Sequence, residues 1–204
     1  MTVDKEIPFL IQPPEPGKIM AILALDVDGV LNKLGRQGSA PLPEAESGGR
    51  KFGIDLVDYA VLDALDKALA CPGVALAWTT TWGSDVANLR QLLGGRLAGG
   101  FVAAERPAGV YVDFGWKEKA VVHLVRRYGA RVAWVDDEAV ANSLRWGNLP
   151  PELAGDRALL VAPEPGAGLS LADAERVAVF LAGMEPEPRA EPRIGGGSTI
   201  GCGS

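Results

Sequence analysis

Two aspartates one residue apart follow an apolar run near the start of the chain. Asp26 and Asp28 come directly after residues 19–25, and Gly29 follows them. A run this apolar is typical of a strand buried on both faces, which needs no acids at its end. Ligands collect beyond the carboxyl ends of parallel strands, and Gly29 permits a sharp turn there. Two converging carboxylates repel each other unless a cation lies between them, so the pair predicts a site for a hard divalent ion such as Mg²⁺.

Polar groups also follow two later apolar runs. The first run, Val74–Trp78, precedes Thr79, Thr80, Thr81 and Trp82, and the second, Arg131–Val135, precedes Asp136 and Asp137. Between them, Lys117 begins a predicted helix. In phosphoryl transfer, a carboxylate can attack phosphorus and a second acid can protonate the leaving oxygen. A hydroxyl and an ammonium can hold the phosphoryl oxygens while the remaining acids hold Mg²⁺, so these residue types favour that chemistry.

The elements that would position these groups alternate between strand and helix. Hydrophobic periodicity predicts strands at residues 19–25, 74–78, 101–103, 131–135 and 158–161. It predicts helices at residues 55–69, from Ser84 or Asp85 to 93, and at 117–128, 139–146 and 171–182. This order favours an α/β fold, a Rossmann-like three-layer sandwich with a mainly parallel central sheet.

The chain of 204 residues is long enough for one domain, predicted at residues 19–182. Proline-rich residues 1–18 and Gly/Ser-rich residues 183–204 are expected to be tails. The net charge of −6 argues against a main affinity for a nucleic-acid backbone. Cys71 and Cys202 form no disulfide framework, and no signal peptide or membrane span is recognisable, so we expect a cytoplasmic protein with no membrane partner.

Two polar stretches lie next to the predicted site. Residues 33–53 are too long for an ordinary connection and are interpreted as a flap, and residues 97–113 are a second candidate for setting specificity. Of the tryptophans that flank the motifs, Trp82 and Trp116 are the better candidates for a wall of the site. His123 lies in the middle of a helix away from every motif and is interpreted as structural.

The order of these motifs resembles that of the haloacid dehalogenase (HAD) superfamily over residues 19–182. By this resemblance Asp26 would be the nucleophile and Asp28 the general acid/base, with the Asp28 main-chain carbonyl also touching Mg²⁺. Thr80 would be the second-motif hydroxyl, although Thr79 or Thr81 could take that place. The fold implied is HAD-like with a minimal cap or none.

The later motifs extend the resemblance. Lys117 is the better match to the third motif, with Lys119 as the alternative. Asp136 and Asp137 match the fourth motif, so that Asp26, Asp28, Asp136 and Asp137 are the predicted metal site. We expect Gly29, Thr81 and Trp82 to bind substrate. The tryptophan contexts also resemble a branch that includes phosphatase-like domains of some RNA-repair proteins.

Several functions are compatible with this motif set. The leading hypothesis is a Mg²⁺-dependent phosphomonoesterase with an aspartyl-phosphate on Asp26, acting on a phosphorylated small molecule. The alternatives are a nucleic-acid end phosphatase with the same chemistry and a non-catalytic HAD-like module that binds phosphate and Mg²⁺. A phospho-receiver module is disfavoured because its acid pair precedes the phosphorylated aspartate. A homo-oligomer that covers the site is a further expectation.

Overall fold

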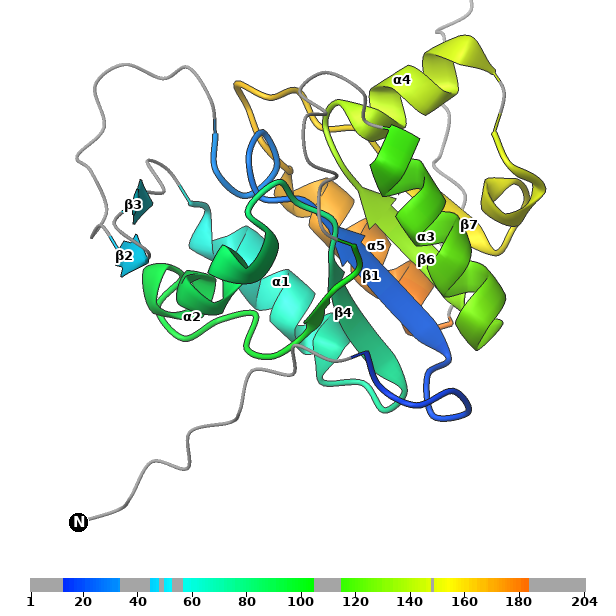
Figure 1. Ribbon diagram of the computed structural model, residues 1–204, viewed down its shortest axis with the longest axis horizontal. Coiled ribbons are helices and arrows are strands. Elements are labelled where there is room, and N and C mark those ends of the chain that lie inside the picture. The colour runs from blue at the N-terminus through cyan, green and yellow to red at the C-terminus, as the bar shows by residue number, and fades with distance from the viewer. Residues whose placement is uncertain are drawn as a thin grey trace, which may run out of the picture.

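A parallel sheet lies at the centre of the chain in this computed structural model (Figure 1). The structure describes residues 13–33, 45–47, 50–52, 57–104, 115–147 and 149–183. The strands are β1 (Ala21–Leu25), β4 (Val74–Trp78), β5 (Phe101–Val102), β6 (Arg131–Val135) and β7 (Ala158–Val161). They are all parallel and follow the spatial order β5-β4-β1-β6-β7. β1 is therefore the middle strand. The next strands, β4 and β5, lie on one side of it, and the last two, β6 and β7, lie on the other. This change of side makes the carboxyl end of β1 the topological switch point, where ligands bind in such sheets.

Helices cover both faces of the sheet (Figure 1). The longer helices are α1 (Tyr59–Leu69), α3 (Gly115–Tyr128), α4 (Ala139–Trp146) and α5 (Leu171–Leu181). Alternate residues of β1 belong to two separate cores: Leu23 packs in the core that contains residues of α1 and α5, and Ile22 packs in the core with residues of α3 and α4. Because both faces of β1 are buried, its sequence is apolar throughout. The predicted three-layer α/β fold is confirmed.

Most predicted boundaries agree with the structure to within two residues, and two differ for local reasons. Helix α1 begins at Tyr59 rather than at residue 55, because Asp58 is extended and its carboxylate accepts the N–H of Ala60. Neither Ser84 nor Asp85 caps the next helix. Both lie inside the 3₁₀ helix η1 (Gly83–Asn88), which is followed by the short helix α2 (Leu89–Leu92).

Three short elements were not predicted. Strands β2 (Ala45–Ser47) and β3 (Arg50–Phe52) pair antiparallel within the predicted flap, and η2 (Pro151–Leu153) precedes β7. Residues 34–44, 48–49, 53–56 and 105–114 lie outside the described residues. The flap and cap predictions therefore fall largely outside them.

Of the two predicted tails, the structure describes residues 13–18 and residue 183. The Tyr128 hydroxyl donates a hydrogen bond of 2.8 Å to the carbonyl of Pro14, which joins this segment to the end of α3. Within the described ranges, no helix has the length and apolar character needed to cross a bilayer.

Candidate active site

Main-chain hydrogen bonds hold the ends of the central strands side by side. The N–H of Asp26 donates to the carbonyl of Val135 at 3.0 Å, and the N–H of Thr79 donates to the carbonyl of Leu25 at 2.9 Å. The N–H of Asp136 donates to the carbonyl of Val161 at 3.1 Å. The sheet ladder thus continues one residue past β1, β4 and β6, so the first polar residue after each strand lies at the same edge.

Lys117 connects two of these strand ends. Its ammonium lies 2.5 Å from Asp26 Oδ2 and 2.8 Å from Asp136 Oδ2. The lysine is on the first turn of α3, and all three side chains are buried. Lys119, two residues further along the helix, is exposed. Of the two lysines considered from the sequence, Lys117 is therefore the one that the fold brings to the acids.

Asp136 and Asp137 have different surroundings. Asp136 Oδ1 accepts the N–H groups of Glu138 and Ala139 at 3.1 and 2.6 Å, so this carboxylate joins the start of α4 to Lys117. Asp137 is only half-buried and lies next to Gly29. A Cβ on Gly29 would overlap the Asp137 carboxylate, and Gly29 has a positive φ of 76°. Glycine at this position therefore permits both the turn and the close approach of Asp137.

Asp26, Asp136 and Asp137 form a cluster that could hold a metal ion. Each offers a carboxylate oxygen, and these oxygens lie within 4.8 Å of one another. With Lys117 as the cation in contact with Asp26 and Asp136, the cluster keeps a formal charge of −2. A hard dication with oxygen ligands would neutralise it, so the residues present fit Mg²⁺.

The pKa values of all three acids in the cluster are raised. Burial, followed by the charge of Asp136, raises the pKa of Asp26 to about 7, although Lys117 opposes the shift. Burial and then the charge of Asp26 raise the pKa of Asp137 to about 6. The pKa of Asp136 is also raised by burial. Burial by itself lowers the pKa of Lys117, but the neighbouring Asp26 and Asp136 outweigh it and the net shift is upward. Burial is thus the largest cause of the raised pKa of each acid, and the single ammonium of Lys117 does not offset it.

Asp28 is not part of this carboxylate cluster. Its Oδ1 accepts a hydrogen bond of 2.8 Å from the Asn32 amide, and its Oδ2 accepts one of 2.8 Å from the Trp82 indole N–H. The predicted role of its main-chain carbonyl toward Mg²⁺ stays a prediction. No role for Asn32 was predicted, although its position four residues after Asp28 was a usable signal for a local side-chain contact.

The three threonines after β4 differ in burial. Thr79 and Thr80 are buried, whereas Thr81 is exposed. Thr80 Oγ1 accepts the N–H of Trp82 at 3.3 Å and keeps its own proton available for donation. The buried Thr79 hydroxyl has no hydrogen-bond partner among the described residues. The choice of Thr80, Thr79 or Thr81 as the phosphate-binding hydroxyl stays a prediction, as does the substrate-binding role of Thr81.

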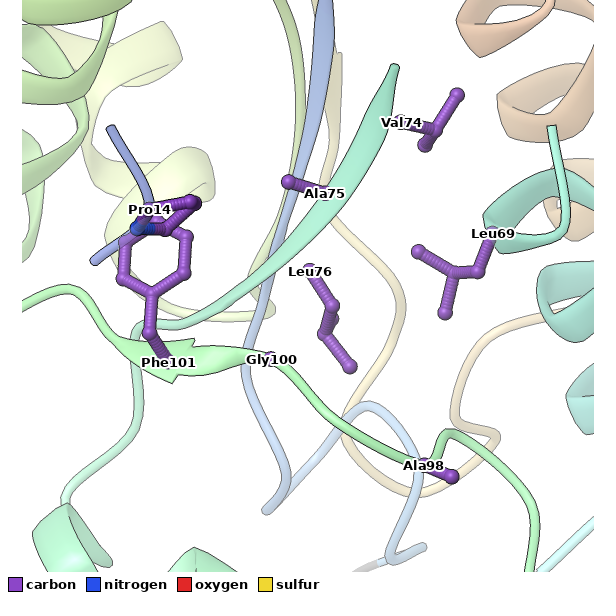
Figure 2. Close-up of a pocket in the computed structure, with 8 residues that line it drawn as sticks. All are labelled: Pro14, Leu69, Val74, Ala75, Leu76, Ala98, Gly100 and Phe101. Carbon is purple, nitrogen blue, oxygen red and sulfur yellow. The ribbon is translucent and has the colours of Figure 1, made fainter. Parts of the chain in front are cut away.

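Other residues considered from the sequence lie elsewhere. Trp116 is buried beside Lys117 in the chain, and His123 is exposed on α3, away from the acids. An apolar pocket at the opposite end of β4 is lined by Pro14, Leu69, Val74, Ala75, Leu76, Ala98, Gly100 and Phe101 (Figure 2). The residues that line this pocket include no acid, nucleophile or cation.

The chain is similar to a known protein family and to a solved structure. Residues 22–174 match the family described as the HAD domain in Swiss Army Knife RNA repair proteins. A solved structure described as a HAD family hydrolase from Streptomyces avermitilis MA-4680 is similar, with 19% identity and a TM-score of 0.38. The match covers 84% of this chain and 95% of that one. A search of curated proteins gives no match. Because the family match spans most of the chain, from β1 to α5, this protein belongs to the family of HAD domains found in Swiss Army Knife RNA repair proteins, and so to the HAD hydrolase superfamily.

Proposed function

We propose that this chain is a Mg²⁺-dependent phosphomonoesterase in which Asp26 is the nucleophile. The observation that carries the proposal is the bridge from Lys117 to both Asp26 and Asp136, with an oxygen of Asp137 close by. A buried lysine between carboxylates from two strand ends supplies positive charge where phosphoryl oxygens would lie. Asp26, Asp136 and Asp137 would hold Mg²⁺, which would offset the repulsion between the nucleophile and an anionic phosphate.

Asp26 is positioned for attack by its two neighbours. Its Oδ1 accepts the N–H of Val27 at 2.7 Å and its Oδ2 accepts from Lys117, so the plane of the carboxylate is set. In the first step an Asp26 oxygen forms a bond to phosphorus while the bond from phosphorus to the ester oxygen breaks. Asp28 gives its proton to that leaving oxygen.

The second step regenerates the carboxylate. A water molecule attacks the phosphorus of the aspartyl-phosphate, and Asp28, now ionised, takes the proton of that water. The bond between phosphorus and Asp26 breaks, which releases inorganic phosphate. The hydroxyl of Thr80, or that of Thr79, would donate to a phosphoryl oxygen throughout.

The direct test measures turnover of 4-nitrophenyl phosphate with Mg²⁺ and after chelation. We expect Asp26→Asn to abolish turnover while the circular dichroism spectrum stays that of the wild type. We expect Asp28→Asn to trap the aspartyl-phosphate, seen by intact-protein mass spectrometry as one added phosphoryl group. Wild-type protein that binds phosphate and Mg²⁺ but turns over no phosphate ester would instead indicate a non-catalytic binding module.

A phosphorylated nucleic-acid end is the second candidate substrate. Lys119, His123, Arg126 and Arg127 lie exposed on α3, the helix whose first turn carries Lys117. The matched family is named for RNA repair proteins. A strand that enters the site could contact this row of side chains through its phosphates. Under this proposal, Lys119→Glu lowers kcat/KM for a phosphorylated oligonucleotide and leaves that for a mononucleotide unchanged. Equal effects on both substrates would remove the nucleic-acid proposal.

A further inference from the structure

The Asp28 carboxylate is held by a different set of groups from those around Asp26. Asp26 contacts a cation and a main-chain N–H, whereas Asp28 accepts one neutral side-chain donor on each oxygen. The indole N–H of Trp82 reaches Oδ2 from 54 residues away in the chain. Two donors on two oxygens fix both the position and the plane of a carboxylate. A single hydrogen bond would leave the carboxylate free to rotate about that bond.

The donor from Asn32 is fixed by the turn after β1. The N–H of Asn32 donates to the carbonyl of Val27 at 2.9 Å, and its carbonyl accepts the N–H of Gly29 at 2.8 Å. Asn32 is buried, so its side chain has little freedom. Its amide therefore meets Asp28 as part of the same turn that places the acid.

The donor from Trp82 is fixed by the segment after β4. Its main-chain N–H donates to Thr80 Oγ1, and its carbonyl accepts the N–H of Asp85 at 3.0 Å at the start of η1. Its ring is partly buried against the core that contains residues of α1 and α5. The indole thus comes from a segment held by hydrogen bonds and core packing, and its N–H donates to Asp28.

We propose that Trp82 is a positioning residue that, together with Asn32, orients Asp28 toward the leaving-group oxygen. This inference rests on the proposed phosphatase function, in which Asp28 protonates the leaving oxygen. Because the indole N–H holds the acid in place, its loss lets the carboxyl group rotate away from the direction of proton transfer. The effect falls on bond breaking, and it is largest where the leaving group most needs a proton.

The experiment compares two aryl phosphates that differ in how much the leaving oxygen needs protonation. In Trp82→Phe the aromatic ring is kept and the N–H is removed. We expect kcat/KM for phenyl phosphate to fall on the order of 10-fold more than kcat/KM for 4-nitrophenyl phosphate. Asp28→Asn, which is expected to stop at the aspartyl-phosphate, sets the upper limit of this bias through its rates for the single release of phenol and of 4-nitrophenol. Trp146→Phe, at an exposed tryptophan on α4, is the control that leaves both rates unchanged. Equal losses for the two substrates, or no loss, would overturn the positioning role.

A second readout does not depend on turnover. In a ¹H–¹⁵N spectrum the indole resonance of Trp82 is identified by its loss in Trp82→Phe. We expect that resonance to move in Asp28→Ala, since its acceptor is removed, while the indole resonance of Trp146 stays in place. A Trp82 indole resonance that does not move in Asp28→Ala would overturn the inference, regardless of the catalytic activity of the protein. Inactive wild-type protein with the expected resonance shift would instead remove the proposed function and leave the contact between Trp82 and Asp28.

Discussion

The absent side chain of Gly29 is what allows the Asp137 carboxylate to reach the turn after β1. A Cβ at position 29 would overlap the carboxylate of Asp137, which follows β6, the strand paired with β1. Contact between these two residues joins the first and last acidic motifs of the chain. The position of a candidate metal ligand therefore depends on a residue that has no functional group of its own.

We predict that Gly29→Ala weakens Mg²⁺ binding by on the order of 10- to 100-fold, because Asp137 must move away from Asp26. The affinity is measured by isothermal titration calorimetry. Gly147→Ala is the matched control, since Gly147 also has a positive φ but a Cβ there meets no atom within 4 Å. Both variants should lose about 1 kcal/mol of stability from backbone strain. Equal Mg²⁺ affinity in the two variants would contradict the role of Gly29.

Removal of the buried ammonium should destabilise the fold more at high pH than at low pH. In Lys117→Met, Asp26 and Asp136 lose the cation between them, and we expect a loss of about 3–5 kcal/mol in metal-free protein at about pH 8. Near pH 5 the loss should be smaller, because Asp26, with its pKa raised to about 7, is then mostly protonated. Urea unfolding at both pH values measures this. Lys119→Met, at an exposed site on the same helix, should change stability by less than about 0.5 kcal/mol.

In metal-free protein, Asp26 should make the folded state less stable as the pH rises. Its pKa is raised from 3.8 to about 7 in the folded protein, so the folded state binds the proton more tightly than the unfolded state. Its favourable contribution is complete below about pH 4 and is lost as the pH approaches and passes about 7. The melting temperature of Asp26→Asn, whose side chain stays neutral, should therefore exceed that of the wild type by a margin that grows over this range. A margin that is constant with pH would refute the raised pKa, and saturating Mg²⁺ should reduce the margin by stabilising the ionised wild type.

A pair of isosteric substitutions separates the two buried threonines. Thr80→Val removes the acceptor of the Trp82 N–H and a donor for phosphate, so we expect kcat/KM to fall on the order of 10- to 100-fold. Thr79→Val replaces a buried hydroxyl that has no partner among the described residues, and we expect unchanged or raised stability with little change in rate. Steady-state kinetics and thermal unfolding provide the measurements. The reverse order of effects would assign the phosphate-binding hydroxyl to Thr79.

The sequence by itself determined the elements with strong apolar patterns and the acids at their ends. Strands β4, β6 and β7 and helix α4 were predicted at their observed bounds, because each combines a clear period with a polar or glycine boundary. The family resemblance followed from the same features, since Asp26 and Asp136 are each the first residue after a buried strand.

Only the tertiary structure decided which candidates meet. Lys117 and Lys119 are about 200° apart around a helix, so one of them must face away from the site, but packing of α3 on the sheet sets which one. The contact from Trp82 to Asp28 spans 54 residues, and it depends on β4 lying beside β1. No local pattern records such a pairing. The different surroundings of Asp26 and Asp28 arise in the same way: the two acids are alike in sequence, and only the elements packed around them supply one with an ammonium and the other with neutral donors.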